Sequence, residues 1–160
     1  MYRERLENAN GFGEIFSLVK SSLAEKLGLH RAGLSLVLMD LPPNILAQHQ
    51  IGSNSIVMNR KTLEAIKAGP GSKLERNSYI FVVLLHEYLH SFGISDEERV
   101  RGLVCEVVEY AFGRDHPTYT AATDPLSLLD NKQLLFKDID VSSKPSIIRD
   151  FDKESMPFIG

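Results

Sequence analysis

The chain lacks the covalent links and the long apolar runs that would mark a secreted or membrane-bound protein. Cys105 is the single cysteine among 160 residues, which excludes a disulfide within the chain and is typical of a reducing compartment. The longest apolar run, residues 79–85, falls far short of the ~20 residues that a membrane-spanning helix needs. Residues 1–10 are charged and contain no apolar segment typical of a signal peptide. We therefore expect a soluble, cytoplasmic protein with no membrane partner.

Neither positive nor negative charge is in large excess. The chain has 18 lysines and arginines against 21 aspartates and glutamates, for a net charge of −3. No basic cluster accumulates along it, so we expect no nucleic-acid partner. Internal repeats and low-complexity tracts are missing too, and nothing specifies an oligomeric state. A length of 160 residues with 43% hydrophobic content suits one domain, residues 1–160, with its own core.

The most informative segment is the motif H-E-x-x-H at residues 86–90. Histidines four residues apart lie on the same face of a helix, so the imidazoles of His86 and His90 can bind one Zn²⁺ together. Glu87 stands beside them, placed to accept a proton from water at the metal. This pattern predicts a zinc site with Glu87 as the catalytic base.

The surroundings of the motif strengthen this interpretation. Because residues 79–85 are almost entirely apolar, a helix over about residues 78–92, ended by Gly93, would be buried on most of its circumference. A buried polar side chain without a partner costs about 1–3 kcal/mol. A metal ion would satisfy both imidazoles at once.

Hydrophobic periodicity along the rest of the chain predicts an α+β fold, in which a small mixed or antiparallel sheet packs against the motif helix and further helices. A strand near a metal can bind extended substrate through its backbone, and we assign that role to residues 55–59. Ser95 and Glu98 predict a capping box for the helix after the motif. The expected elements are helices at 4–28, 61–67, 78–92, 95–112 and 127–136, strands at 34–39 and 55–59, and an extended polar tail at 137–160.

A catalytic zinc usually has three protein ligands and one open position, so a third ligand must follow His90. Asp96 is the first candidate. Residues 86–96 read H-E-x-x-H-x-x-G-x-x-D, which resembles the metzincin signature with aspartate in place of the final histidine. Gly93 would supply the turn that brings Asp96 back to the metal.

The second and third candidates lie further along the chain. Glu109 follows His90 after 18 intervening residues, a spacing that resembles that of gluzincin aminopeptidases, and Glu106 lies on the neighbouring helix face. His116 is the only histidine after the motif, and imidazole is a common zinc ligand. To reach the metal, however, the chain after the second helix would have to fold back. The three candidates stay open on these grounds alone.

The block L-H-E-Y-L-H-S-F-G at residues 85–93, followed closely by a second helix in a small chain, resembles the minigluzincins. These are small, soluble, mainly archaeal zinc peptidases of the zincin clan. The resemblance covers about residues 33–117 and implies a minimal zincin-like domain that binds Zn²⁺. It also implies His86 and His90 as ligands, Glu87 as general base and His116 as the third ligand.

The function expected from motif and resemblance is hydrolysis of a peptide bond in a peptide or protein substrate. Glu87 would take a proton from zinc-bound water and pass it to the leaving amine, and Tyr110 or Tyr119 could stabilise the oxyanion. In minigluzincins the C-terminal segment keeps the enzyme latent, as in a zymogen, which implies a regulatory tail at about residues 140–160.

Two other functions compete with peptide hydrolysis. H-x-x-x-H-x-x-G followed by an acidic helix also resembles a bacterial endoribonuclease family, which would make the chain a zinc-dependent hydrolase of RNA. That family ends its motif with histidine and has no glutamate at the second position. The other alternative is a structural zinc site without catalysis, which a fourth protein ligand would support, for example Asp96 and His116 together.

Overall fold

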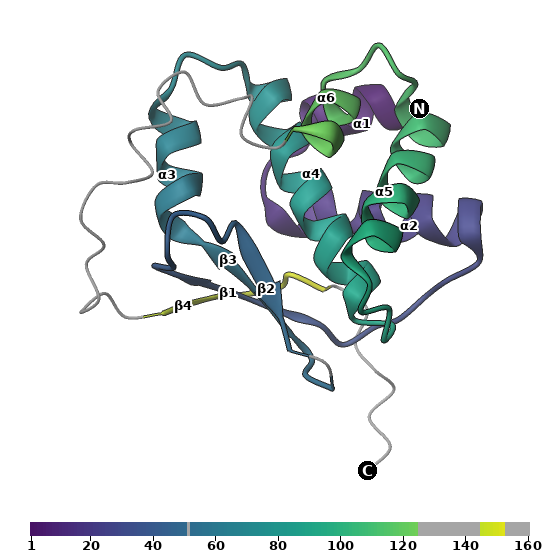
Figure 1. Ribbon diagram of the computed structural model, residues 1–160. Helices are drawn as coiled ribbons and strands as arrows, with labels where there is room; N and C mark the ends of the chain where they lie inside the picture. The colour runs from purple at the N-terminus through teal and green to yellow at the C-terminus, as the bar shows by residue number, and fades with distance from the viewer. Residues whose placement is uncertain (51, 125–144, 153–160) are drawn as a thin grey trace.

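Helices and strands form separate layers in the computed structural model, which describes residues 1–50, 52–124 and 145–152. The helices gather on one side of a small sheet, and α4 runs through the middle of them (Figure 1). The described part of the chain is a mixed α+β fold, as the sequence predicts. Its helices are α1 (Tyr2–Asn8), α2 (Phe12–Leu27), α3 (Arg60–Ala68), α4 (Lys73–His90), α5 (Glu97–Phe112) and α6 (Pro117–Thr123). Its strands are β1 (Ser35–Met39), β2 (Ala47–His49), β3 (Ser55–Asn59) and β4 (Ser146–Ile148).

The sheet has the strand order β2-β3-β1-β4, in which β1 and β3 are parallel and the outer pairs are antiparallel. Alternate residues such as Leu36, Ile56 and Met58 are fully buried, as expected when one face of a sheet packs against helices. The role assigned to β3 from the sequence is wrong. Because β3 has a hydrogen-bonded strand on both sides, it has no free edge to bind an extended substrate. The edge strands of the described sheet are β2 and β4.

The first predicted helix is divided in two. Gly11 adopts a φ of 131°, a conformation that side-chain-bearing residues rarely adopt, and it separates α1 from α2. The side-chain amide of Asn77 on α4 donates hydrogen bonds to the carbonyl oxygens of Leu6 (2.8 Å) and Ala9 (3.1 Å). These bonds tie the end of α1 to α4, where the last carbonyls of a helix lack partners further along the helix. Gly28 ends α2 in the left-handed conformation, as predicted.

The motif helix is longer at its start than expected. Helix α4 begins at Lys73 because Ser72 and Glu75 form a capping box, which the sequence interpretation missed. The core side of α4 is almost continuously buried from residue 77 to residue 85. No helix among the described residues is both long enough and apolar enough to cross a membrane.

The segment of residues 145–152 contributes one buried hydrophobic side chain, Phe151, to the core of the molecule. Its strand β4 pairs with β1, and the buried ring of Phe151 stacks on Phe16 with 4.2 Å between centroids. The Asp152 carboxylate forms a buried ion pair with Lys20 at 2.7 Å and accepts a hydrogen bond from the backbone of Leu34 at 3.1 Å. The tail expected at about 140–160 is therefore in part a strand of the sheet. The helix expected at 127–136 lies outside the described residues.

We expect Phe151→Ala to lower the free energy of unfolding by about 3–5 kcal/mol, the usual cost of truncating a buried phenylalanine. Ile147→Thr is the matched control, because Ile147 is on the same segment but 72% exposed, and it should cost less than about 0.5 kcal/mol. Urea unfolding followed by circular dichroism measures both. Equal and small effects would mean that this segment is not part of the core.

Candidate metal centre

The two histidines of the motif lie one turn apart on the last part of α4, where the helix leaves the buried layer. Their Nε2 atoms are 3.2 Å from each other, and their side chains are 23% and 12% exposed. Arg31 holds this end of the helix, since its guanidinium donates to the Ser91 carbonyl and its backbone exchanges hydrogen bonds of 2.8 Å with the Tyr88 hydroxyl. The imidazoles are thus fixed side by side.

Glu97 completes a group with the two histidines. Its two carboxylate oxygens lie 2.9 Å from His86 Nε2 and 2.8 Å from His90 Nε2. One donor atom from each of the three side chains falls within 4.8 Å of the others. Gly93, with a φ of 88°, reverses the chain between α4 and α5, so the first turn of α5 returns over the end of α4. These three side chains can hold a metal ion.

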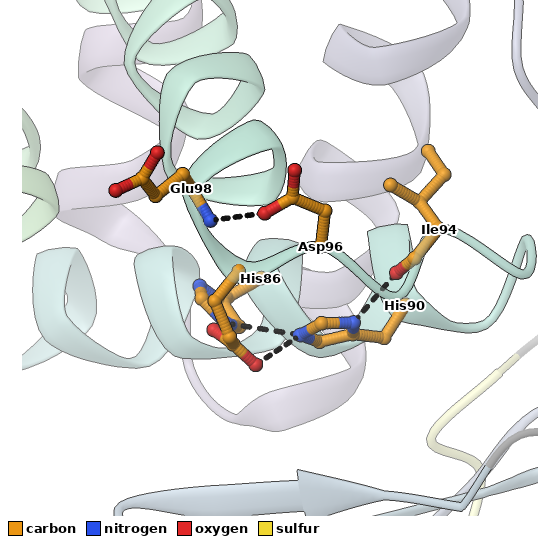
Figure 2. Close-up of polar contacts among 6 residues, drawn as sticks. His86, His90, Ile94, Asp96 and Glu98 are labelled. Carbon is orange, nitrogen blue, oxygen red and sulfur yellow. Dashed lines mark hydrogen bonds and ion pairs between the residues drawn. The ribbon is translucent and has the colours of Figure 1, made fainter.

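The hydrogen-bonding pattern of His90 is compatible with a metal ion bound by these three side chains. Its Nδ1 lies 2.7 Å from the carbonyl oxygen of Ile94 (Figure 2), and a carbonyl can only accept, so Nδ1 carries the proton. The second nitrogen of the ring, Nε2, is the atom left to bind a metal, and it faces the carboxylate of Glu97 and the ring of His86. Nitrogen and carboxylate oxygen atoms that converge in this way share a cation, either a proton or a metal ion. Two nitrogens bound at about 2.05 Å to a tetrahedral ion are roughly 3.3 Å apart, close to the spacing of the two Nε2 atoms.

Burial changes the acidity of the two motif residues nearest the cleft. Desolvation lowers the pKa of His86, Glu97 opposes this change, and the neighbouring side chains of His90 and Arg101 lower the pKa further. A neutral imidazole is the form that binds a metal. Burial raises the pKa of Glu87 to about 7, with a further increase from Glu97 and a decrease from His90. A carboxyl group of that acidity can both accept and release a proton near neutral pH.

A cleft of about 560 Å³ opens beside these residues. His86, Glu87 and Glu97 line its polar side, and Glu87 is only 6% exposed. The segment that leads into the edge strand β2 forms another part of the lining. The remaining lining comes from α4, α5 and the end of α6; the complete set is Asn44, Ile45, Leu46, Ala47, Val82, Val83, His86, Glu87, Glu97, Arg101, Val104, Ala122, Thr123 and Asp124.

The structure does not bring any of the four residues predicted as third ligands into the group. His116 is buried as the N-cap of α6, where its Nδ1 accepts from the Thr118 backbone and its ring stacks on Phe112. Burial lowers the pKa of His116 to about 4, with a smaller decrease from Arg3. The group of potential metal ligands found among the described residues consists of His86, His90 and Glu97.

The acidic candidates have other contacts. Asp96 caps α5 by accepting from the Glu98 backbone at 3.0 Å (Figure 2), so the capping box predicted for Ser95 is wrong by one residue. Glu109 pairs with Arg114 at 3.0 Å, and Glu106 is exposed on α5. Glu97, which lies between Asp96 and Glu98, is the carboxylate that contacts the histidines of α4.

Sequence reasoning missed Glu97 because Asp96, Glu97 and Glu98 all suit the first turn of a helix, where acidic residues are favoured by the helix dipole. The available signal was the short connection after Gly93, which returns the start of α5 to the end of α4. A shift of one residue in the cap then decides which carboxylate faces the histidines. The two tyrosines proposed as oxyanion donors, Tyr110 and Tyr119, do not line the cleft.

No family model, no curated protein and no solved structure matches this chain.

Proposed function

We propose that the chain is a zinc-dependent peptidase with a minimal zincin-like domain. The observation that carries the proposal is the convergence of His86, His90 and Glu97 on one point beside the buried carboxyl group of Glu87, all at one cleft. This arrangement combines three ligand atoms with a proton acceptor, which is the combination that metal-assisted hydrolysis requires.

Zinc is the metal that suits this donor set best. Two imidazole nitrogens and one carboxylate oxygen are typical of catalytic zinc sites, which leave a fourth position open. When bound, the ion would supply Lewis-acid chemistry, making water more acidic and polarising a carbonyl group. Among the described residues no fourth protein ligand joins the group, which favours catalysis over a purely structural site.

Glu87 would move the proton during the reaction. It follows His86 directly on α4 and lines the same cleft, and burial keeps the pKa of its carboxyl group near 7. As a base it would accept a proton from the attacking water, and as an acid it would return that proton to the leaving amine. No described residue forms a hydrogen bond with its carboxylate, so the group is available for this exchange.

The shape of the cleft suits an extended peptide. Residues 44–47 form one wall and lead into β2, whose outer edge has no partner strand among the described residues. An extended chain can add to such an edge through backbone hydrogen bonds. Hydrolysis of RNA is less compatible with the cleft, because Glu87, Glu97 and Asp124 line it against a single arginine and would repel phosphates.

The test is metal-dependent hydrolysis of a mixed peptide library, read by mass spectrometry. We expect cleavage by the zinc-loaded protein, loss of cleavage after dialysis against a chelator, and recovery on adding back one equivalent of Zn²⁺. Cleavage that survives complete metal removal would contradict the proposal. So would a loaded protein that cleaves nothing in the library.

A further inference from the structure

Arg101 is placed to contact whatever occupies the cleft. It lies on α5 one helical turn after Glu97, and it is the only lysine or arginine among the described residues that line the cleft. Residues four apart on a helix face have Cβ atoms about 6 Å from each other. The guanidinium group therefore lies within reach of a ligand bound beside the candidate metal centre.

The guanidinium of Arg101 has no hydrogen-bond or ion-pair partner among the described residues. Its natural partner on the helix would be Glu97 four residues earlier, but both oxygens of that carboxylate are directed to His86 and His90. Within the described part of the chain, all five donors of the guanidinium are thus without a partner. Arginine binds carboxylates through two parallel hydrogen bonds, which makes a carboxylate the best match among peptide groups.

Part of the lining of the same cleft is apolar. Four small or branched aliphatic side chains contribute to it, and an apolar lining would accept an aliphatic side chain rather than a charged one. They come from α4, one turn before the first histidine, from α5 and from α6. These residues are Val82, Val83, Val104 and Ala122.

We propose that Arg101 is a specificity residue that binds a carboxylate of the substrate while the apolar lining of the same cleft holds an aliphatic side chain. The inference rests on the proposed peptidase function, because the ligand is taken to be the substrate of that reaction. Binding of a carboxylate by Arg101 can nevertheless be measured without hydrolysis. Two sources share this chemistry: the free C-terminal carboxylate of a peptide, and the side chain of an internal aspartate or glutamate.

Binding tests the site directly. We expect zinc-loaded full-length protein to bind N-acetyl-L-leucine roughly 10–100-fold more tightly than N-acetyl-L-leucinamide, as measured by titration of backbone amide NMR signals. Arg101→Gln should abolish this difference, and Arg101→Lys should keep part of it. Arg99→Gln is the matched control, because Arg99 is exposed on the same helix but does not line the cleft, and it should behave as the wild type.

Equal binding of acid and amide by the wild type would overturn the proposal, as would a preference that survives in Arg101→Gln. Cleavage of three matched peptides then separates the two carboxylate sources: one with a free C-terminus, one amidated, and one amidated with an internal aspartate. Faster cleavage of the first by the wild type, lost in Arg101→Gln, assigns the terminal carboxylate. The same result for the third assigns an acidic side chain. If no peptide is cleaved, the proposed peptidase function fails, while the binding result still decides the role of Arg101.

Discussion

Glu87→Gln should reduce peptide hydrolysis by about 10²–10⁴-fold, the contribution that a positioned acid–base group usually makes. Glutamine keeps the size of the side chain but can neither accept nor return a proton at the pH of the assay. Because Glu87 is not among the three side chains that can hold the metal, the variant should retain its zinc. Elemental analysis measures the zinc content of the variant, and the peptide-library assay measures its hydrolysis.

The fold of this variant should be intact, since glutamine removes a buried carboxyl group whose pKa burial raises to about 7. We therefore expect thermal unfolding at or above the wild-type temperature. Hydrolysis within about threefold of the wild type would contradict the assignment of Glu87 as the base. Loss of zinc together with activity would instead place Glu87 among the ligands.

Glu97→Ala should weaken zinc binding by more than the roughly 10–100-fold that loss of a hydrogen bond to a ligand costs, because it removes a ligand outright. The side chain is 58% exposed at the first position of α5, so its truncation should leave the fold unchanged. Glu98→Ala is the matched control: Glu98 is the next residue and carries the same charge, and its side chain is outside the group of potential ligands. Competition with a chromogenic chelator measures the affinities.

The same titration distinguishes Glu97 from the third ligand that the family resemblance implies. His116→Asn keeps a side-chain oxygen able to cap α6 and should bind zinc as tightly as the wild type. Loss of zinc in His116→Asn with retention in Glu97→Ala would mean that His116, and not Glu97, is the third zinc ligand.

The parts of the fold that could be predicted are those with strong local signals. The strands β1 and β3, the short helix α3, the end of α2 at Gly28 and the end of α5 at Gly113 all agree with the sequence patterns. The break at Gly11 could not be predicted in this way, because apolar periodicity continues on both sides and the hydrogen bonds from Asn77 that satisfy α1 are contacts across 68 and 71 residues.

The sequence predicts the part of the candidate site that lies on a single helix. His86, Glu87 and His90 lie within one turn of one helix, so their relative placement follows from helix geometry. The partner from α5 depends on the cap of a second helix and on the turn at Gly93, where one residue changes which carboxylate faces inward. The strand beside the cleft is β2, of which only 3 residues are in the sheet. Its place at the edge follows from pairing with β3 rather than from a local pattern.

We expect this chain to bind one zinc ion at His86, His90 and Glu97, and the zinc content of the purified protein tests this binding. After incubation with Zn²⁺ and gel filtration, elemental analysis should find about one zinc per chain in the wild type and almost none when both histidines are replaced by alanine. A wild-type protein without zinc would contradict this expectation. So would a double variant that keeps its zinc, since the ion would then be bound elsewhere.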